Sequence, residues 1–134
     1  MSETETKPFE AQSVAATDMD ERLKALQSCS DDCSSDNWDG KGAKAVTTQL
    51  REVAELFLKQ LPSHIPPPEV EADLDGEINF EWYLEPRKVF SISLNAEGRL
   101  SYAGLFGPAK SHGTEMFQDS IPREIILKLD RLFS

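Results

Sequence analysis

The sequence predicts an α+β fold in which a four-stranded antiparallel β-meander packs on one face against two or three helices. Three observations carry this prediction: a helical apolar stripe in residues 48–61, alternation of apolar and polar residues after Pro68, and another apolar stripe in residues 122–133. A period of 3.6 residues buries one stripe of a helix, whereas a period of two buries one face of a sheet. Helices and hairpins that are segregated along the chain are typical of two-layer α+β domains.

Residues 1–16 are rich in Ser, Thr, Glu and Ala and contain few apolar side chains. Such a composition buries too little apolar surface to offset the entropy lost on ordering, so it favours a disordered acidic arm. We therefore expect a single α+β domain in residues 17–134, with its core in residues 37–134.

A short helix is expected from Thr17, because Thr17 and Asp20 form a near capping box at its start. The apolar residues that share one face of this helix are Met19, Leu23 and Leu26. The polar segment 28–36 should then break the helix.

The most regular helix signal spans residues 48–61. Pro62 ends it, and the proline run that follows, residues 65–68, favours a stiff extended connector. The last helix is predicted from about residue 122 to residue 133, since Pro122 suits a first helical turn.

Four strands are predicted where the alternation holds, over residues 70–74, 78–84, 90–94 and 100–104. The Asp75-Gly76 pair is a strong hairpin signal between the first two strands. Short connections throughout indicate an up-and-down meander with one buried face. The segment 106–113, which contains Gly and Pro, is expected to be a loop.

The chain is acidic, with 24 Asp and Glu against 14 Lys and Arg and a formal net charge of −10. This balance repels phosphate backbones, so we expect no direct nucleic-acid binding and favour a basic protein partner. No apolar run approaches the roughly 20 residues of a membrane span, and the polar N-terminus lacks the layout of a secretory signal. We expect a cytoplasmic protein without a membrane partner.

No catalytic or cofactor-binding motif is complete. Residues 104–111 miss the phosphate-binding pattern G-x-x-x-x-G-K-[ST], because Ala109 takes the place of the second glycine. Structural zinc sites pair their ligands at short spacings, and the four Cys and His residues depart from such spacings. These four are Cys29, Cys33, His64 and His112. We therefore expect no catalytic residue, no metal and no cofactor.

An acidic cluster coincides with the first predicted hairpin and contains no Lys or Arg. Its members are Glu69, Glu71, Asp73, Asp75, Glu77 and Glu81. If the two strands pair, most of these carboxylates lie on the face opposite the apolar residues. The cluster is either a solubilising face that blocks aggregation or a docking surface for a basic partner.

Trp38 lies in a short Gly-containing turn, residues 37–43. It either plugs the edge of the core and fixes the entry into the second helix, or anchors a partner, since Trp is enriched at binding hot spots. Both interpretations stay open at this point.

Several of these segments resemble a group of short uncharacterised bacterial proteins. The shared motifs are an N-W-D-G-x-G-A opening, here residues 37–43, and a P-P-P-E-(I/V)…D-G-x-I-x-x-E-W meander, here residues 66–82. The resemblance covers residues 37–102. It implies a bacterial or phage origin, a non-secreted protein and an association with toxin–antitoxin or defence genes, and it carries over no activity and no site residue.

The sequence therefore favours a non-enzymatic protein-interaction module, of the antitoxin, inhibitor or accessory type, that docks a basic protein through its acidic strands and Trp38. Two alternatives stay open. One is a small enzyme with a site in the predicted loop 107–113 around His112. The other is an acidic mimic of nucleic acid, which differs from the first reading only in its target.

Overall fold

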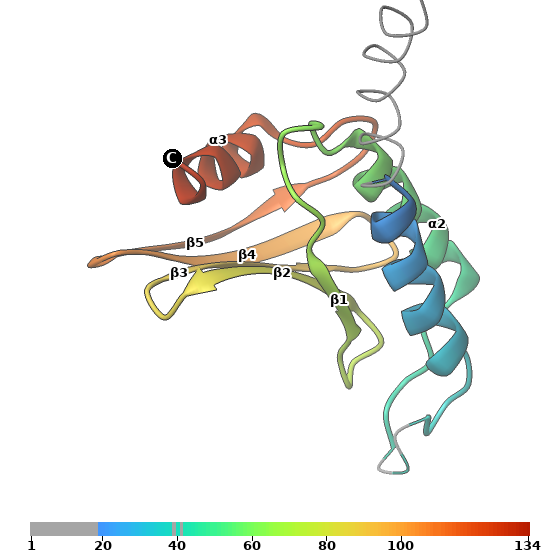
Figure 1. Ribbon diagram of the computed structural model, residues 1–134. Helices are drawn as coiled ribbons and strands as arrows, with labels where there is room; N and C mark the ends of the chain where they lie inside the picture. Colours follow the sequence, from blue (N-terminus) through green and yellow to red (C-terminus); the bar gives the residue numbers. More distant parts are fainter. Residues whose placement is uncertain (1–18, 39, 41) are drawn as a thin grey trace, which may run out of the picture.

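The computed structural model describes residues 19–38, 40 and 42–134 (Figure 1). The predicted acidic arm, residues 1–16, and the predicted cap at Thr17 lie outside the described residues. Within them the fold is α+β, with a five-stranded antiparallel sheet and helices on its apolar face. The predicted fold class is confirmed, and the predicted number of strands is wrong.

Helical structure covers residues 19–32, α2 (Thr48–Gln60) and α3 (Arg123–Leu132). The side chain of Thr47 caps α2 by accepting a hydrogen bond from the Leu50 N–H at 3.1 Å. The first helix continues through most of the segment that we expected to break it. Leu26 and Ser30 of the helix are buried, and so is Cys33 directly after it, so burial on this side continues through the polar segment.

The strands are β1 (Glu69–Ala72), β2 (Ile78–Glu85), β3 (Lys88–Leu94), β4 (Arg99–Phe106) and β5 (Ala109–Met116). They pair in sequence order, each antiparallel to the next. The meander topology is therefore confirmed, with a strand more than predicted.

The fifth strand replaces the loop expected at residues 106–113. Gly107 takes a positive φ of 66° in the short turn that leads back into β5. The core side of β5 has no large apolar residue: Gly113 lies under Tyr102, where an added Cβ would stand 2.6 Å from the phenol oxygen. A strand built this way has no apolar alternation, which is why the sequence pattern missed it.

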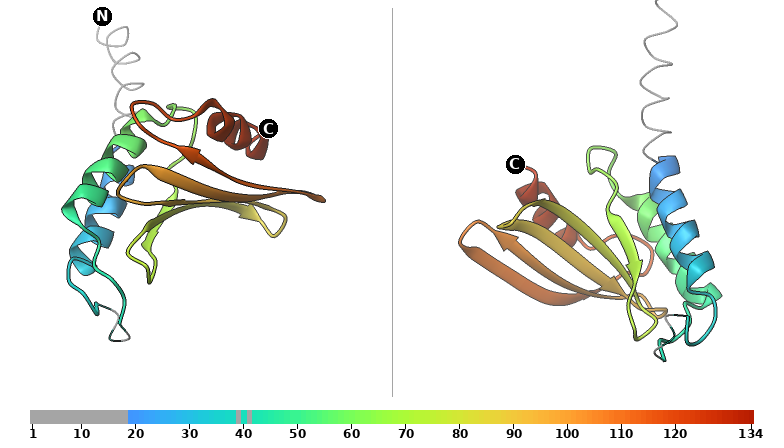
Figure 2. Two further views of the ribbon diagram at one scale, coloured as in Figure 1. Left: turned by 180° about the vertical axis from the view of Figure 1, so that it is seen from behind. Right: turned by 60° about the horizontal axis from the view of Figure 1, so that its bottom comes forward.

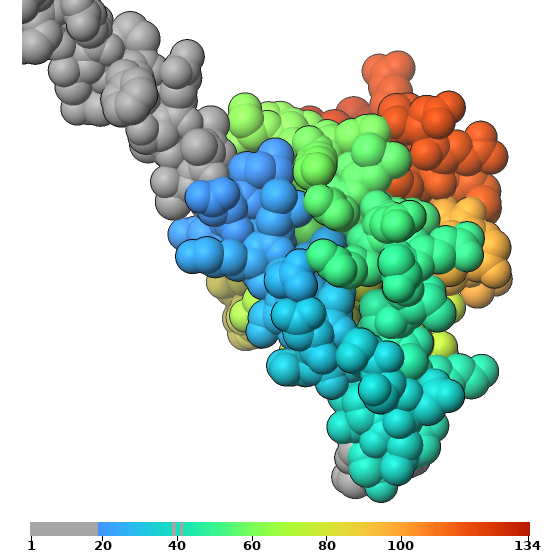
Figure 3. All heavy atoms as spheres, turned by 90° about the vertical axis from the view of Figure 1, so that its right-hand side faces the viewer, coloured from blue at the N-terminus to red at the C-terminus, as the bar shows by residue number. Residues whose placement is uncertain are grey.

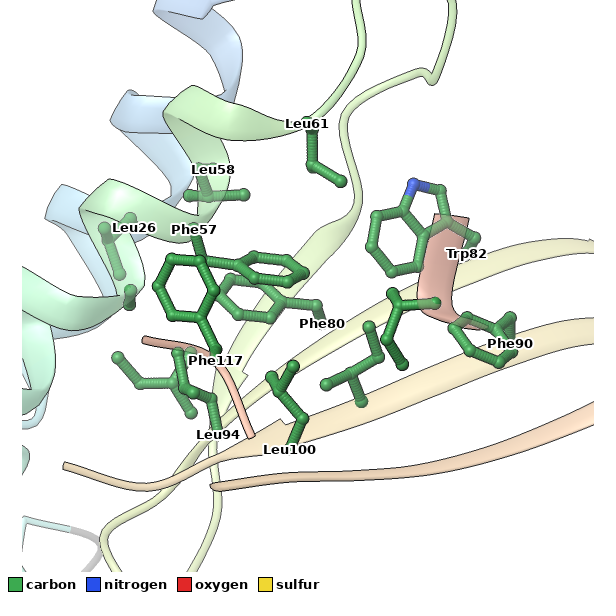
Figure 4. Packing of buried hydrophobic residues seen from close by; sticks show 14 of the residues in the cluster. Leu26, Phe57, Leu58, Leu61, Phe80, Trp82, Phe90, Leu94, Leu100 and Phe117 are labelled. Atoms are coloured by element: carbon green, nitrogen blue, oxygen red, sulfur yellow. The ribbon is translucent and has the colours of Figure 1, made fainter. Parts of the chain in front are cut away.

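The helices lie on one side of the sheet, with α3 over one end and α2 and helix 19–32 at the other (Figures 1 and 2). Figure 4 shows the core between them, in which Phe57 of α2 stacks on Phe80 of β2 with ring centroids 5.0 Å apart. Phe117, after β5, closes this cluster edge-on at 5.6 Å from Phe57. None of the described helices covers the opposite face of the sheet (Figure 2), which we call the uncovered face.

Helix 19–32 lies beside α2 (Figure 3). Arg22 of this helix, which is 2% exposed, connects it to the C-terminal end of α2. The guanidinium donates to the carbonyls of Leu58, Leu61 and Pro62 at 3.3, 3.1 and 3.1 Å and also to that of Ile65. These acceptors include the carbonyls that a helix end leaves without intrahelical partners.

Candidate partner-binding face

The strand register arranges the uncovered face in rows. One row runs Glu69, Glu81, Ser91, Ala103 and His112 across the five strands. Along this row the side chains are acidic on β1 and β2, small and neutral on β3 and β4, and an imidazole on β5. Because neighbouring strands lie about 4.8 Å apart, its two ends are separated by roughly 19 Å.

The acidic end of the uncovered face consists of Glu69, Glu71 and Glu81. Glu69 and Glu81 are directly opposite each other in the β1–β2 ladder, and Glu71 is opposite Asn79. Glu69 and Glu71 are exposed and Glu81 is half-buried. Among residues 19–38, 40 and 42–134, none of the three forms an ion pair. Like charges at directly opposed positions destabilise a sheet, so the acidic end carries a local cost without an internal counter-charge.

The other members of the predicted acidic cluster lie in the hairpin turn. The Asp73 carboxylate accepts hydrogen bonds from the N–H groups of Asp75 and Glu77 at 2.9 and 3.0 Å, so it stabilises the turn. Glu77 lies 3.8 Å from the Arg99 guanidinium. Burial raises the pKa of the Glu77 carboxyl, and the charge of Asp73 adds to the rise. The structure thus gives Asp73 and Glu77 contacts within the hairpin region, leaves Asp75 exposed in the turn, and separates these three acids from the three at the acidic end.

A groove of about 560 Å³ borders the acidic end. Glu69 and Glu81 line it together with Pro66 and Tyr83, and the tyrosine side chain is 58% exposed. The indole N–H of Trp82 donates to the Pro66 carbonyl at 2.8 Å and so fixes the proline wall of the groove. Two carboxylates and an exposed aromatic ring therefore face one hollow.

Trp38 is half-buried and packs against the core cluster. Its indole N–H donates to the Lys44 carbonyl at 2.8 Å. The neighbouring Asn37 has a positive φ of 63°, and its side chain accepts from the Gly42 N–H at 2.6 Å. Trp38 also lines a groove of about 600 Å³ beside β1, together with Cys29. Trp38 therefore packs at the edge of the core, and part of its ring stays accessible to solvent.

His112, the centre of the alternative enzyme interpretation, lies in the middle of strand β5 and is exposed on the uncovered face. The loop 107–113 that this alternative assumed is therefore wrong, because β5 begins at Ala109. Ser111 is followed by strand and not by the helix N-terminus that phosphate binding needs. The sequence did not reveal the contact of the other histidine, His64, whose Nε2 lies 2.7 Å from an Asp130 carboxylate oxygen. These two residues are 66 positions apart, and nothing in the spacing pairs them.

Within the described part of the chain, no group of three or more His, Cys, Asp or Glu side chains is placed to hold a metal ion. Cys29 and Cys33 are free thiols one helical turn apart. Burial, followed by the neighbouring Cys33 thiol, raises the pKa of Cys29 to about 12.

Comparisons of the chain with protein-family models, curated proteins and solved structures found no match. Across the described ranges, no helix combines the length and the apolar character needed to cross a lipid bilayer.

Proposed function

We propose that this protein is a non-enzymatic interaction module that binds a basic protein through the acidic end of its uncovered face. The observation that carries the proposal is the direct opposition of Glu69 and Glu81 on paired strands, on a face that no described helix covers. A cationic side chain seated between the two carboxylates would remove their mutual repulsion and gain two charge-assisted hydrogen bonds.

The groove beside the acidic end supports this proposal. Tyr83 and Pro66 supply an aromatic and an apolar wall next to Glu69 and Glu81. An arginine combines a planar cation with an apolar stem, so it suits a hollow that has carboxylates on one side and a ring on the other. The favoured anchor on the partner is therefore an Arg, or a Lys, flanked by apolar residues.

The type of partner follows from the charge and from the resemblance noted above. The net charge of −10 would steer a basic protein toward this chain and repel anionic surfaces. Together with the resemblance to bacterial proteins, this favours an antitoxin, inhibitor or accessory protein that acts in the cytoplasm. The acidic strand face can also serve as a mimic of nucleic acid if the partner is itself a nucleic-acid-binding protein.

The test is co-expression with the products of the adjacent genes, followed by co-purification of any complex and titration at 50 and 300 mM salt. The decisive variant combines Glu69→Gln, Glu71→Gln and Glu81→Gln. We expect the wild-type affinity to fall at least about tenfold with the added salt, and the triple variant to bind at least about tenfold more weakly at low salt.

The matched control removes three charges elsewhere: Asp20→Asn, Glu52→Gln and Asp119→Asn, all at exposed positions. This control changes net charge equally, so it should retain most of the affinity. Equal losses in the two triple variants would reduce the effect to net charge and reject a defined site. Competition by a DNA duplex for the bound partner would identify the nucleic-acid mimic.

A further inference from the structure

A second hollow lies on the uncovered face at the end opposite the acidic residues. It has a volume of about 390 Å³ and is formed by β3, β4 and β5. Val89, Ala103 and Leu105 form its apolar floor. The register explains the hollow, because small Ala103 lies between Ser91 and His112 in one row while Val89 and Leu105 are opposite each other in the next.

One side of the rim of this hollow carries an ammonium and an imidazole. Lys110 and His112, neighbours on the outer side of β5, both line it and are both exposed. In the part of the chain that the structure describes, neither side chain has a carboxylate within ion-pair distance. In a chain of net charge −10, a Lys110 ammonium without a carboxylate partner among the described residues is a local reversal of sign, and the His112 imidazole adds a second nitrogen donor beside it.

The floor offers little to a polyanion. Ser91 is its polar member on β3, and the Ser91 hydroxyl donates to the Asn79 amide oxygen at 3.0 Å. An inorganic phosphate needs donors on several sides. In this hollow the nitrogen donors lie along one strand, the Ser91 hydroxyl donates to Asn79, and Val89, Ala103 and Leu105 present hydrocarbon. The chemistry that fits is a single anionic head joined to an apolar body.

We propose that this hollow binds a small amphipathic carboxylate. The carboxylate accepts hydrogen bonds from the Lys110 ammonium and the His112 imidazole, and the hydrocarbon body lies on Val89, Ala103 and Leu105. Its volume falls at the lower end of the range for small-ligand sites, which suits a body of six to eight carbons, as an order of magnitude. The site uses other strands and the opposite charge from the acidic end, so it stands independently of the proposed function.

The test is a series of two-dimensional ¹H–¹⁵N NMR titrations of the full chain with butanoate, hexanoate and octanoate. We expect shifts concentrated in the amides of residues 89–91, 103–105 and 110–112. Affinity should rise by at most about fourfold for each added CH₂ group until the floor is covered. Octanamide, which has the same body and no charge, should bind about tenfold more weakly.

Two variants test the two halves of the site. Ala103→Trp fills the hollow from an exposed strand position and should abolish the shifts, whereas Lys110→Gln should weaken octanoate binding about tenfold and leave octanamide unaffected. Lys59→Gln on α2 is the matched control and should change neither. If Ala103→Trp does not fold, the Lys110→Gln comparison decides alone.

Three results would overturn the proposal. The first is the absence of chemical-shift changes up to about 10 mM octanoate, which would place the Kd above that concentration and so rule out a specific site. The second is equal binding of octanoate and octanamide, which would show a non-specific apolar contact. The third is binding of only a peptide with a free C-terminal leucine carboxylate, which would assign the hollow to a chain terminus of a protein.

Discussion

The indole N–H of Trp82 donates to the carbonyl of Pro66 at 2.8 Å, which links the buried face of β2 to the proline connector. This bond holds the wall of the groove at the acidic end. Replacing Trp82 by Phe leaves the Pro66 carbonyl without its donor and removes part of a ring that is 3% exposed. We expect Trp82→Phe to lower the free energy of unfolding by about 2–3 kcal/mol in urea denaturation.

Trp38→Phe is the natural comparison for that variant. It removes an equivalent bond, from the indole N–H to the Lys44 carbonyl at 2.8 Å, at the surface of the molecule. Water can replace the lost donor there, so we expect a cost of about 1 kcal/mol or less. Equal losses of unfolding free energy in the two variants would show that the Trp82–Pro66 bond stabilises the fold no more than the exposed Trp38–Lys44 bond.

Arg22 should be the side chain whose replacement by Lys is least tolerated. Its guanidinium reaches the carbonyls of Leu58, Leu61 and Pro62 from one buried position. A lysine ammonium is a single point charge without the planar fork of donors, so it cannot reach all the carbonyls that surround the guanidinium. We expect Arg22→Lys to cost about 2–4 kcal/mol of unfolding free energy, measured by chemical denaturation.

Arg51→Lys provides the control for Arg22. Arg51 donates to the Gln27 amide oxygen at 2.7 Å in an exposed contact between α2 and helix 19–32. Its replacement should change stability by no more than about 0.5 kcal/mol. A similar effect at Arg22 would contradict the bridging role inferred from its acceptors.

Glu81 should show opposite effects on stability and on binding. Glu81→Gln removes the repulsion with Glu69 across the β1–β2 ladder. We expect a gain of about 0.2–0.5 kcal/mol in unfolding free energy at low salt that disappears at high salt. The same variant should weaken capture of a basic partner. A loss of stability would mean that the two carboxylates are not in repulsive contact, and would weaken the proposed function.

The parts of the fold that the sequence predicted are those in which burial follows a simple period. α2 has its buried residues at helical spacing, and most of β2 and β3 alternates buried with half-buried side chains. β5 is half-buried on its inner side and carries Ala, Ser, Gly and Glu there, so no apolar alternation marks it. Its pairing with β4 depends on a tertiary fit, such as Tyr102 over Gly113, that no local pattern contains.

The acidic end could be predicted in part. Alternation placed Glu69, Glu71 and Glu81 on one strand face, and the register agrees. The sequence could not show that Asp73 is used by backbone N–H groups of its own turn. It also gave no sign of the hollow on β3–β5, because that hollow results from small and large side chains meeting across strands that are distant in the chain.

Glu77 should make stability fall as the pH rises. Burial raises its pKa above the usual value of 4.5, Asp73 adds to the rise, and Arg99 opposes it. The folded state therefore binds the proton more tightly than the unfolded state. The contribution is fully present below pH 4.5 and is lost as the pH rises through the higher folded pKa.

The measurement for Glu77 is urea denaturation from pH 3.5 to 7 for the wild type and for Glu77→Gln. We expect the wild type to lose stability relative to Glu77→Gln as the pH rises over this range. Asp75→Asn, in the same turn and exposed, serves as the control for a general change of charge. A difference that moves in favour of the wild type would show that the contact with Arg99 outweighs burial.

Cys29 should react unusually slowly. Its pKa of about 12 results from burial first, then from the neighbouring Cys33 thiol, with Asp32 and Glu71 adding negative charge. At pH 8 a far smaller fraction is thiolate than in free cysteine, and the higher nucleophilicity of that thiolate recovers part of the loss. A Cys33→Ser background removes the second thiol and its share of the rise, but burial still raises the pKa of Cys29 there. We therefore expect slower reaction with a disulfide reagent than for free cysteine, and a return to the ordinary rate in urea. Asp32→Asn combined with Glu71→Gln should raise the rate in the folded protein, whereas a rate that is the same in folded and unfolded protein would contradict the environment described for Cys29.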